Sequence, residues 1–314
     1  MSYTILRPKT HEEWLELRMT GIGSSDVGTI LGVNSYDTPY QLWARKKGIL
    51  PPKKESTQMM MGHVLEPIVA DLYEKASGNI IQKDTEGDWC VRNNDKSFLI
   101  ASPDRIATAQ DGSDILLECK TTQRDVSQDH IPDSWMCQVQ YLMHITELKE
   151  GALAWLKNGV DFDYKKIVYN EAFAAYMIEK VERFWTDNII GNKEPECLTG
   201  EDVVLRYNKS EKGKIAQATD ELRNAWDRLV ELNKTITDLT AQKDEIVERM
   251  KIATADAEKL MYGEKVLGAF IGGKESTKEA FNIEKFKAEN AELYAKYVEV
   301  NSYVTARSYR PKYS

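Results

Sequence analysis

The chain has 314 residues, 42% of them hydrophobic, which favours one large domain with an extension. No run of about 18 apolar residues occurs, which excludes a membrane-spanning helix, and the N-terminus lacks the apolar segment of a signal peptide, so we expect a cytoplasmic protein. The four cysteines show no Cys-x-x-Cys spacing, which argues against zinc or iron–sulfur binding. The net charge of −8 argues against nucleic-acid binding, and the acidic excess lies in residues 1–200, where 30 Asp and Glu face 22 Lys and Arg.

The N-terminal region predicts a short helix over residues 11–18 and a second helix after a glycine-rich break. Ser24, Ser25 and Asp26 follow this break, and all three are favourable N-cap residues. A turn followed by a capped helix explains the segment without any function. The N–H groups and hydroxyls of such a helix start would also suit a phosphate, and the sequence supports the two interpretations equally.

A longer helix is predicted over residues 59–77, because apolar residues recur there on one arc. These residues are Met61, Val64, Leu65, Ile68, Val69, Leu72 and Tyr73. Glu66 falls at the border of this arc, where a carboxylate is half-buried and needs a partner. The partner is either a basic side chain in a structural salt bridge or a metal site over which Glu66 leans.

A β-hairpin is predicted around two acidic residues, Asp104 and Glu118. A short aliphatic run accompanies each, and the turn signal Asp111-Gly112 lies between them. Side chains alternate along a strand, so Glu118 and Lys120 share one face while Cys119 points the other way, into the core. The hairpin would bring Asp104 beside Glu118 from the neighbouring strand.

The residue types in this hairpin suggest a chemistry. Two carboxylates within hydrogen-bonding range repel each other unless a cation lies between them, and a hard divalent metal prefers such oxygen ligands. Lys120 could orient the attacking water or neutralise charge on a phosphate, so the set is typical of phosphodiester hydrolysis. The alternative is a solvated strand surface, since Glu and Lys two residues apart are common by chance. The hydrophobic neighbours favour a buried strand, where charges are costly unless they are used.

Further elements continue the α/β pattern after the hairpin. A helix is predicted to start near Asp133, and Gln138 lies among its apolar residues, so its amide must be hydrogen-bonded. Strands are predicted over residues 152–156 and 166–169, and a helix over residues 171–189.

The C-terminal region carries a heptad pattern over about 39 residues. The a positions hold Ile215, Leu222, Leu229, Ile236, Lys243 and Met250, and the d positions hold Ala218, Ala225, Leu232, Leu239, Ile246 and Ala253. The pattern predicts a long helix in a coiled coil or helical hairpin. Its partner surface is a later helix of this chain, another protomer or a second protein; we favour a local helical hairpin that serves as a docking surface. A β-hairpin at residues 262–271, a helix over 283–297 and a strand over 298–307 are expected to follow.

Five ordered segments together resemble the YqaJ-like viral recombinases, relatives of the phage lambda exonuclease in the PD-(D/E)xK nuclease superfamily. The segments are Leu17-Arg18 with Gly21-Ile22-Gly23-Ser24-Ser25-Asp26, Met61-Gly62-His63-Val64-Leu65-Glu66, Ser102-Pro103-Asp104, Leu117-Glu118-Cys119-Lys120 and Gln138-Val139-Gln140-Tyr141. They span roughly residues 14–145, and their order makes the match specific where each motif alone is weak. The helical tail lies outside the resemblance.

The resemblance implies a restriction-endonuclease-like core, dependence on Mg²⁺ with Mn²⁺ as a substitute, and 5′-to-3′ degradation of one strand of duplex DNA. It assigns Asp104, Glu118, Glu66 and the Cys119 backbone carbonyl to the metal, Lys120 to catalysis and Gln138 to a supporting role. It assigns Arg18 and Ser25, with the adjacent Ser24, to a 5′-phosphate; Arg124 joins them, although its spacing from Lys120 is two residues shorter than in the family. A trimeric ring around DNA and a single-strand annealing protein as partner are also implied.

The predicted fold is therefore α/β, with a mixed central sheet flanked by helices and a long helical C-terminal extension. We expect a nuclease domain over residues 1–205 and a coiled-coil or helical extension with a small hairpin over residues 206–314. The predicted function is a Mg²⁺-dependent DNA exonuclease of phage-type recombination that acts on double-stranded ends in a bacterial host. An endonuclease of the same superfamily and a catalytically silent DNA- or partner-binding scaffold are the alternatives. The intact set of Asp104, Glu118 and Lys120 disfavours the scaffold.

Overall fold

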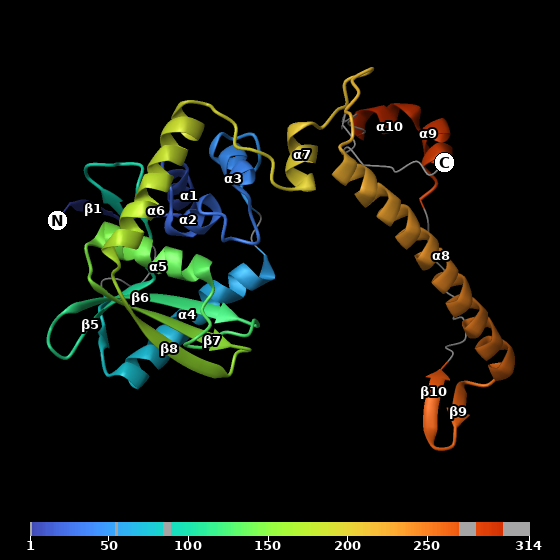
Figure 1. The fold of residues 1–314 in the computed structure, drawn as a ribbon, viewed down its shortest axis with the longest axis horizontal. Helices are drawn as coiled ribbons and strands as arrows, with labels where there is room; N and C mark the ends of the chain where they lie inside the picture. The colour runs from blue at the N-terminus through green and yellow to red at the C-terminus, as the bar shows by residue number, and fades with distance from the viewer. Residues whose placement is uncertain (1, 54–55, 84–88, 270–280, 298–314) are drawn as a thin grey trace. The chain divides into compact units, whose positions relative to one another are not determined.

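The computed structural model describes residues 2–53, 56–83, 89–269 and 281–297. The chain divides into two compact units, Met1–Arg206 and Tyr207–Ser314 (Figure 1). Within the described ranges, no helix is both long and apolar enough to cross a membrane.

The first unit is built on a mixed five-stranded sheet. Its strands, in spatial order, are β2 (Ile80–Ile81), β5 (Arg105–Thr108), β6 (Asp114–Thr122), β7 (Glu150–Lys157) and β8 (Asp161–Val168). The predicted β5–β6 hairpin is confirmed, and β7 and β8 form a second antiparallel pair. Strands β6 and β7 are parallel and therefore need a crossover, which the predicted helix α5 (Asp133–Thr146) provides.

Helices cover both faces of this sheet. Helix α4 (Thr57–Ser77) packs on one face, and α5 lies on the opposite face beside α6 (Glu171–Arg183) (Figure 1). Successive residues of β6 alternate between the two hydrophobic cores: Leu116 belongs to the core under α5, and Leu117 to the core under α4. This arrangement confirms the predicted fold class of a mixed sheet flanked by helices.

A smaller sheet and several short helices complete the first unit. They are β1 (Tyr3–Leu6), β3 (Cys90–Asn93), β4 (Ile100–Ala101), α1 (His11–Met19), α2 (Ser24–Ile30), α3 (Pro39–Lys46), the π-helical continuation η2 of α6 (Phe184–Ile190) and α7 (Gly200–Arg206). The turn before α2 runs tightly against the loop before β4. A Cβ atom on Gly21 would lie 2.3 Å from the carbonyl oxygen of Phe98, so glycine is required there.

The predicted apolar arc of α4 is correct only in part. Leu72 and Tyr73 pack in the core against the sheet together with Val69, while Leu65 is half-buried. Met61, Val64 and Ile68 are 44%, 59% and 46% exposed. The helix packs on the sheet through its C-terminal half, so the apolar residues of its N-terminal half are not buried.

The second unit is dominated by α8 (Asp220–Thr254), the long helix that the heptads predict. The helix has 35 residues and begins later than expected, because the Thr219 hydroxyl caps the backbone N–H of Leu222; Ile215 and Ala218 therefore lie outside it. Strands β9 (Lys259–Tyr262) and β10 (Lys265–Ala269) follow as the expected hairpin. In the part of the chain that the structure describes, no second helix pairs with α8, so the expected helical hairpin is wrong there.

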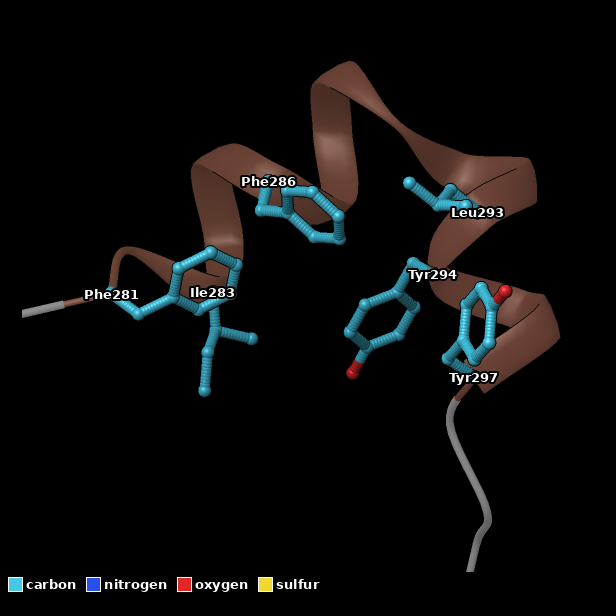
Figure 2. Close-up of a pocket in the computed structure, with 6 residues that line it drawn as sticks. All are labelled: Phe281, Ile283, Phe286, Leu293, Tyr294 and Tyr297. Carbon is cyan, nitrogen blue, oxygen red and sulfur yellow. The ribbon is translucent and has the colours of Figure 1, made fainter.

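The helix expected over residues 283–297 is divided in two. Asn290 leaves the helical conformation between α9 (Ile283–Glu289) and α10 (Ala291–Tyr297). The two short helices line an open apolar pocket formed by Phe281, Ile283, Phe286, Leu293, Tyr294 and Tyr297 (Figure 2). The strand expected over residues 298–307 and the end of the expected β-hairpin lie outside the described residues.

Candidate active site

The β5–β6 hairpin brings Asp104 and Glu118 together as predicted. Arg105, the first residue of β5, is paired with Leu117 of β6, so the preceding Asp104 lies beside the next residues of β6. The Asp104 carboxylate accepts a hydrogen bond of 2.7 Å from the backbone N–H of Cys119. Asp104 is thus fixed at the edge of the hairpin by main-chain geometry.

Glu118 and Lys120 share one face of β6 and contact each other directly. The Lys120 ammonium lies 2.6 Å from Glu118 Oε1. Gln138 of α5 joins this pair: its Nε2 donates to the same Glu118 oxygen at 2.5 Å, and its Oε1 accepts from Lys120 at 2.9 Å. The expectation that the Gln138 amide is hydrogen-bonded is confirmed, and each of its two polar atoms has a partner in the cluster.

Glu66 approaches from α4 and forms a structural salt bridge, one of the two partners that the sequence left open for it, although Arg105 was not predicted as the base. Its carboxylate lies 2.6 Å from the guanidinium of Arg105, whose side chain is 8% exposed. Arg105 also donates to the Asp104 backbone carbonyl. A signal for Arg105 was present, because strand alternation places the residue after Asp104 on the face that α4 covers.

The Glu118 carboxylate is the most deeply buried charge of this cluster. Glu118 is 1% exposed, and its second oxygen, Oε2, has no hydrogen-bond partner among the described residues. A buried carboxylate oxygen without a partner is costly, so the geometry suits a cation at this atom. Within the described ranges no group of three or more His, Cys, Asp or Glu side chains is arranged to hold a metal ion. Lys120 pairs with Glu118 and Arg105 with Glu66.

The carboxylates of the cluster hold protons more tightly than usual. Burial, followed by the charge of Asp104, raises the pKa of Glu118 to about 8 and that of Glu66 to about 7. Burial also raises the pKa of Asp104. Burial disfavours the Lys120 ammonium, but Glu118 and Asp104 outweigh this effect and raise its pKa.

These shifts have a common cause in the charge count. Three carboxylates face the cations Lys120 and Arg105, and His63 also lies near Asp104. Not counting His63, full ionisation leaves one uncompensated negative charge in a buried place. The cluster therefore retains a proton near neutral pH unless a cation takes its place.

Cys119 has the structural position that the strand alternation predicts. Its side chain is 8% exposed and lies in the core under α4. Burial raises the pKa of this thiol well above its ordinary value, which keeps it neutral and unreactive. Any part in a metal site would come from its backbone.

A second charged cluster surrounds the start of α2. Arg18 donates to the Ser25 hydroxyl at 2.7 Å and lies 3.6 Å from the Asp26 carboxylate. Lys46 of α3 lies 2.9 Å from the same carboxylate and donates to the Arg18 carbonyl. Although burial opposes it, Lys46 and Arg18 lower the pKa of Asp26. Nothing in the sequence marked Lys46 beyond its place in a short basic run.

The expected capping of α2 by Ser24, Ser25 or Asp26 is wrong. Gly23 is the N-cap residue, and the Asp26 carboxylate accepts from its backbone N–H at 3.0 Å. Asp26, inside the helix, thus satisfies the backbone N–H of the N-cap residue. Ser24 and Ser25 are the first two residues of the helix.

Arg124 does not join the cluster of Arg18, Ser25, Asp26 and Lys46 (the Arg18 cluster) but contacts other residues. In the described structure it donates to the Tyr36 hydroxyl and to Ser35 at 3.5 Å, and its guanidinium stacks 4.8 Å from the Tyr36 ring centre. No hydrogen bond or ion pair of these described residues joins Arg124 to Arg18 or Ser25.

Helix α5 connects the two clusters. Gln138 reaches the Glu118–Lys120 pair, and one turn later the Tyr141 hydroxyl donates to the Ile22 carbonyl at 2.7 Å, in the turn before α2. Positions i and i+3 lie on the same side of a helix, so one face of α5 contacts both the Glu118–Lys120 pair and the turn before α2.

The fold and the first cluster define a class of protein, an α/β domain with a buried site of acids and one lysine on the central strand of its sheet. The chain belongs to the YqaJ-like viral recombinase family. The family's domain matches residues 13–149. The uncharacterized protein YqaJ of Bacillus subtilis (strain 168) is 30% identical over 261 residues, which cover 79% of this chain and 80% of that protein.

Several solved structures are also similar to the chain. The complex of LHK-Exo with dAMP has 16% identity and a TM-score of 0.47 over 57% of this chain and 93% of that chain. The alkaline exonuclease LHK-Exo from Laribacter hongkongensis has 17% identity and a TM-score of 0.43 over the same shares. A phage-related exonuclease from Haemophilus somnus 129PT has 11% identity and a TM-score of 0.40 over 55% and 96%.

Proposed function

We propose that this protein is a Mg²⁺-dependent DNA exonuclease of phage-type recombination, with Mn²⁺ as a substitute. It would degrade one strand of linear duplex DNA from the 5′ end and expose the other strand for annealing. The observation that carries the proposal is the unpartnered buried oxygen of Glu118, beside Asp104 and Lys120. Membership of a viral recombinase family agrees with it.

Asp104, Glu118 and the backbone carbonyl of Cys119 would hold the cation, with Glu66 as an additional acid. This donor set consists of oxygens only, which is what Mg²⁺ and Mn²⁺ prefer. Bound Mg²⁺ would supply Lewis-acid stabilisation of charge on the phosphate. Binding of the dication would change the net charge of the buried cluster from one negative to one positive. A positive site favours binding of an anionic phosphodiester.

Lys120 would act on the reacting atoms, and Gln138 would position it. The ammonium of Lys120 would orient the attacking water or stabilise negative charge on the phosphate. Gln138 holds this ammonium through its carbonyl oxygen and holds Glu118 through its amide, so it fixes the angle between the two.

The Arg18 cluster would hold the 5′-phosphate. Asp26 is shared between Arg18 and Lys46, so the three side chains carry one net positive charge. The Arg18 side chain is 32% exposed and can reach an anion, while Ser25 and Ser24 would add hydroxyl donors. Arg124 and Tyr36 would contact DNA separately, through the guanidinium and its stacked ring.

The biological setting follows from the family. We propose that the protein acts on double-stranded DNA ends in the cytoplasm of a bacterial host, with a single-strand annealing protein as partner and as a homo-oligomer. A trimeric ring rests on the family resemblance alone.

The test compares linear duplex DNA, labelled at either 5′ end or 3′ end, with covalently closed circular DNA in the presence of Mg²⁺. Release of label from 5′-labelled ends, with circular DNA intact, supports the proposal. The Glu118→Gln variant and a reaction with EDTA are the matched controls. Cleavage of circular DNA would replace the proposal by an endonuclease, and binding without cleavage in Mg²⁺ or Mn²⁺ would replace it by a scaffold.

A further inference from the structure

Helix α8 carries a long apolar stripe that the described part of its unit leaves open. Leu222, Leu229, Leu232, Ile236, Leu239 and Ile246 occupy a and d positions of consecutive heptads. Each of these six side chains is between 37% and 60% exposed. A stripe of this spacing is the seam of a coiled coil, which is buried when another helix packs on it.

The pattern disfavours a parallel pairing of two copies. In parallel register each a position faces its own equivalent, so Lys243 would lie against the partner's Lys243 within the seam. The flanking g and e positions would pair Glu221 with the partner's Trp226 and Arg249 with the partner's Thr254. No flanking pair in this register would join opposite charges.

An antiparallel pairing removes both problems. In the register where Leu232 faces the partner's Ile236, Leu229 faces the partner's Leu239 and Leu222 faces the partner's Ile246. Lys243 then faces the partner's Ala225, a small residue past which its chain can extend to water. Glu221 flanks the partner's Arg249, and two-fold symmetry produces every one of these pairs twice.

We propose that α8 pairs with α8 of a second copy of this chain as an antiparallel coiled coil in this register. The occupant of the stripe is then a second copy, because the helix is complementary to itself in both its apolar layers and its flanking charges. The pairing uses only residues of the second unit, and it does not depend on the proposed nuclease activity.

Charge reversal tests the register on the full chain by analytical ultracentrifugation. Arg249→Glu alone and Glu221→Arg alone should each raise the Kd of self-association about 10-fold, because each places two like-charge pairs beside the seam. The double variant should return to within about 3-fold of the wild type, since it restores both pairs with exchanged signs. Lys234→Glu, on the outer face of α8, is the matched control and should leave the Kd unchanged. Monomeric wild-type protein, or a double variant no tighter than the singles, would overturn the proposal.

Cross-linking tests the direction independently of the charges. Leu229→Cys and Leu239→Cys are made singly in a Cys197→Ser background, since the other three cysteines are buried. A short bis-maleimide should link a mixture of the two variants and neither variant alone, because in the antiparallel register equivalent positions lie about 15 Å apart along the axis. Links within each variant alone would show a parallel pairing, and three linked chains would show a trimer; either result overturns the proposal. Circular dichroism checks that each variant keeps its helix content.

Discussion

The two units of this chain differ in which kind of side chain they place against the usual preference for burial or exposure. The first unit buries charge: Glu118 is 1% exposed and one of its oxygens has no partner among the described residues. The second exposes apolar surface: Leu222 and Ile236 of α8 are each 60% exposed. Folding alone favours neither arrangement, because buried charges and exposed aliphatic side chains both cost free energy.

The difference shows what each unit lacks. In the proposed function, a small cation would compensate the excess negative charge of the buried cluster. An apolar stripe on a 35-residue helix is completed only by a surface of similar length, which means another helix. If both proposals hold, the first unit serves chemistry and the second association, and changes in one should leave the other intact.

The largest effect is expected from removing charge in the buried cluster. Asp104→Asn and Glu118→Gln keep the shape of each side chain but remove a proposed cation ligand, so hydrolysis of short linear duplexes should fall about 10³-fold or more. The fold should survive, because the variants also remove a buried charge; thermal unfolding measures this. A rate near that of the wild type in either variant would end the assignment of this site.

Lys120→Ala should have the next largest effect, a loss of about 10²-fold in turnover. In the proposed function the lysine acts on the reacting atoms and is no cation ligand, so calorimetry should still detect Mg²⁺ binding by the variant. Lost Mg²⁺ affinity with retained chemistry would show that Lys120 holds the site together and takes no part in the reaction.

Arg18→Ala should reduce only the preference for 5′-phosphorylated ends. We expect the wild type to degrade these ends about 10-fold faster than 5′-hydroxyl ends, since a charge-assisted bond to the phosphate is lost in the latter. Arg124→Ala is the matched control, because Arg124 lies against Tyr36 and should leave the preference in place. Equal wild-type rates on both kinds of end would leave Arg18 and Ser25 with a structural role.

Much of the first unit could be predicted from local patterns in the sequence. Strand alternation placed Glu118 and Lys120 on one face and Cys119 on the other, and the turn signal placed Asp104 beside them. These relations span only a few residues along one hairpin, so the period of the strand determines them. The amide of Gln138 was also expected to be bonded, although its partners depend on how α5 crosses the sheet.

The relations that sequence could not supply are those between distant elements. Arg105 meets Glu66 because α4 packs on the face of β5, and Lys46 meets Asp26 because α3 folds back onto α2. No periodicity within one element contains such a contact. The predicted burial of the N-terminal, methionine-containing end of α4 was wrong for the same reason. The apolar arc of this helix extends beyond the sheet surface on which it packs.

A smaller effect is expected from pH on cation affinity. The pKa of Glu118 is raised to about 8, so protons compete with the cation below that pH, and affinity should rise as pH rises towards 8. Lowering the pH from 8 to 7 should weaken Mg²⁺ binding about fivefold for one competing proton. Calorimetry at several pH values measures this. An affinity that stays constant between pH 6 and 8 would mean that the cluster is already ionised without the cation.

The smallest effect on hydrolysis should come from the apolar stripe of α8. Leu229→Glu combined with Leu232→Glu places four charges in the seam of a pair, so association should be lost, while hydrolysis of short duplexes should change less than about 2-fold. Light scattering follows the native mass, and Thr237→Glu with Ala241→Glu on the outer face of α8 is the control for added charge. If the seam variant loses mass and hydrolysis together while the control keeps both, the assembly holds the active site in shape. The division into a chemical unit and an associating unit would then fail, because the buried charges of the first would need the stripe of the second.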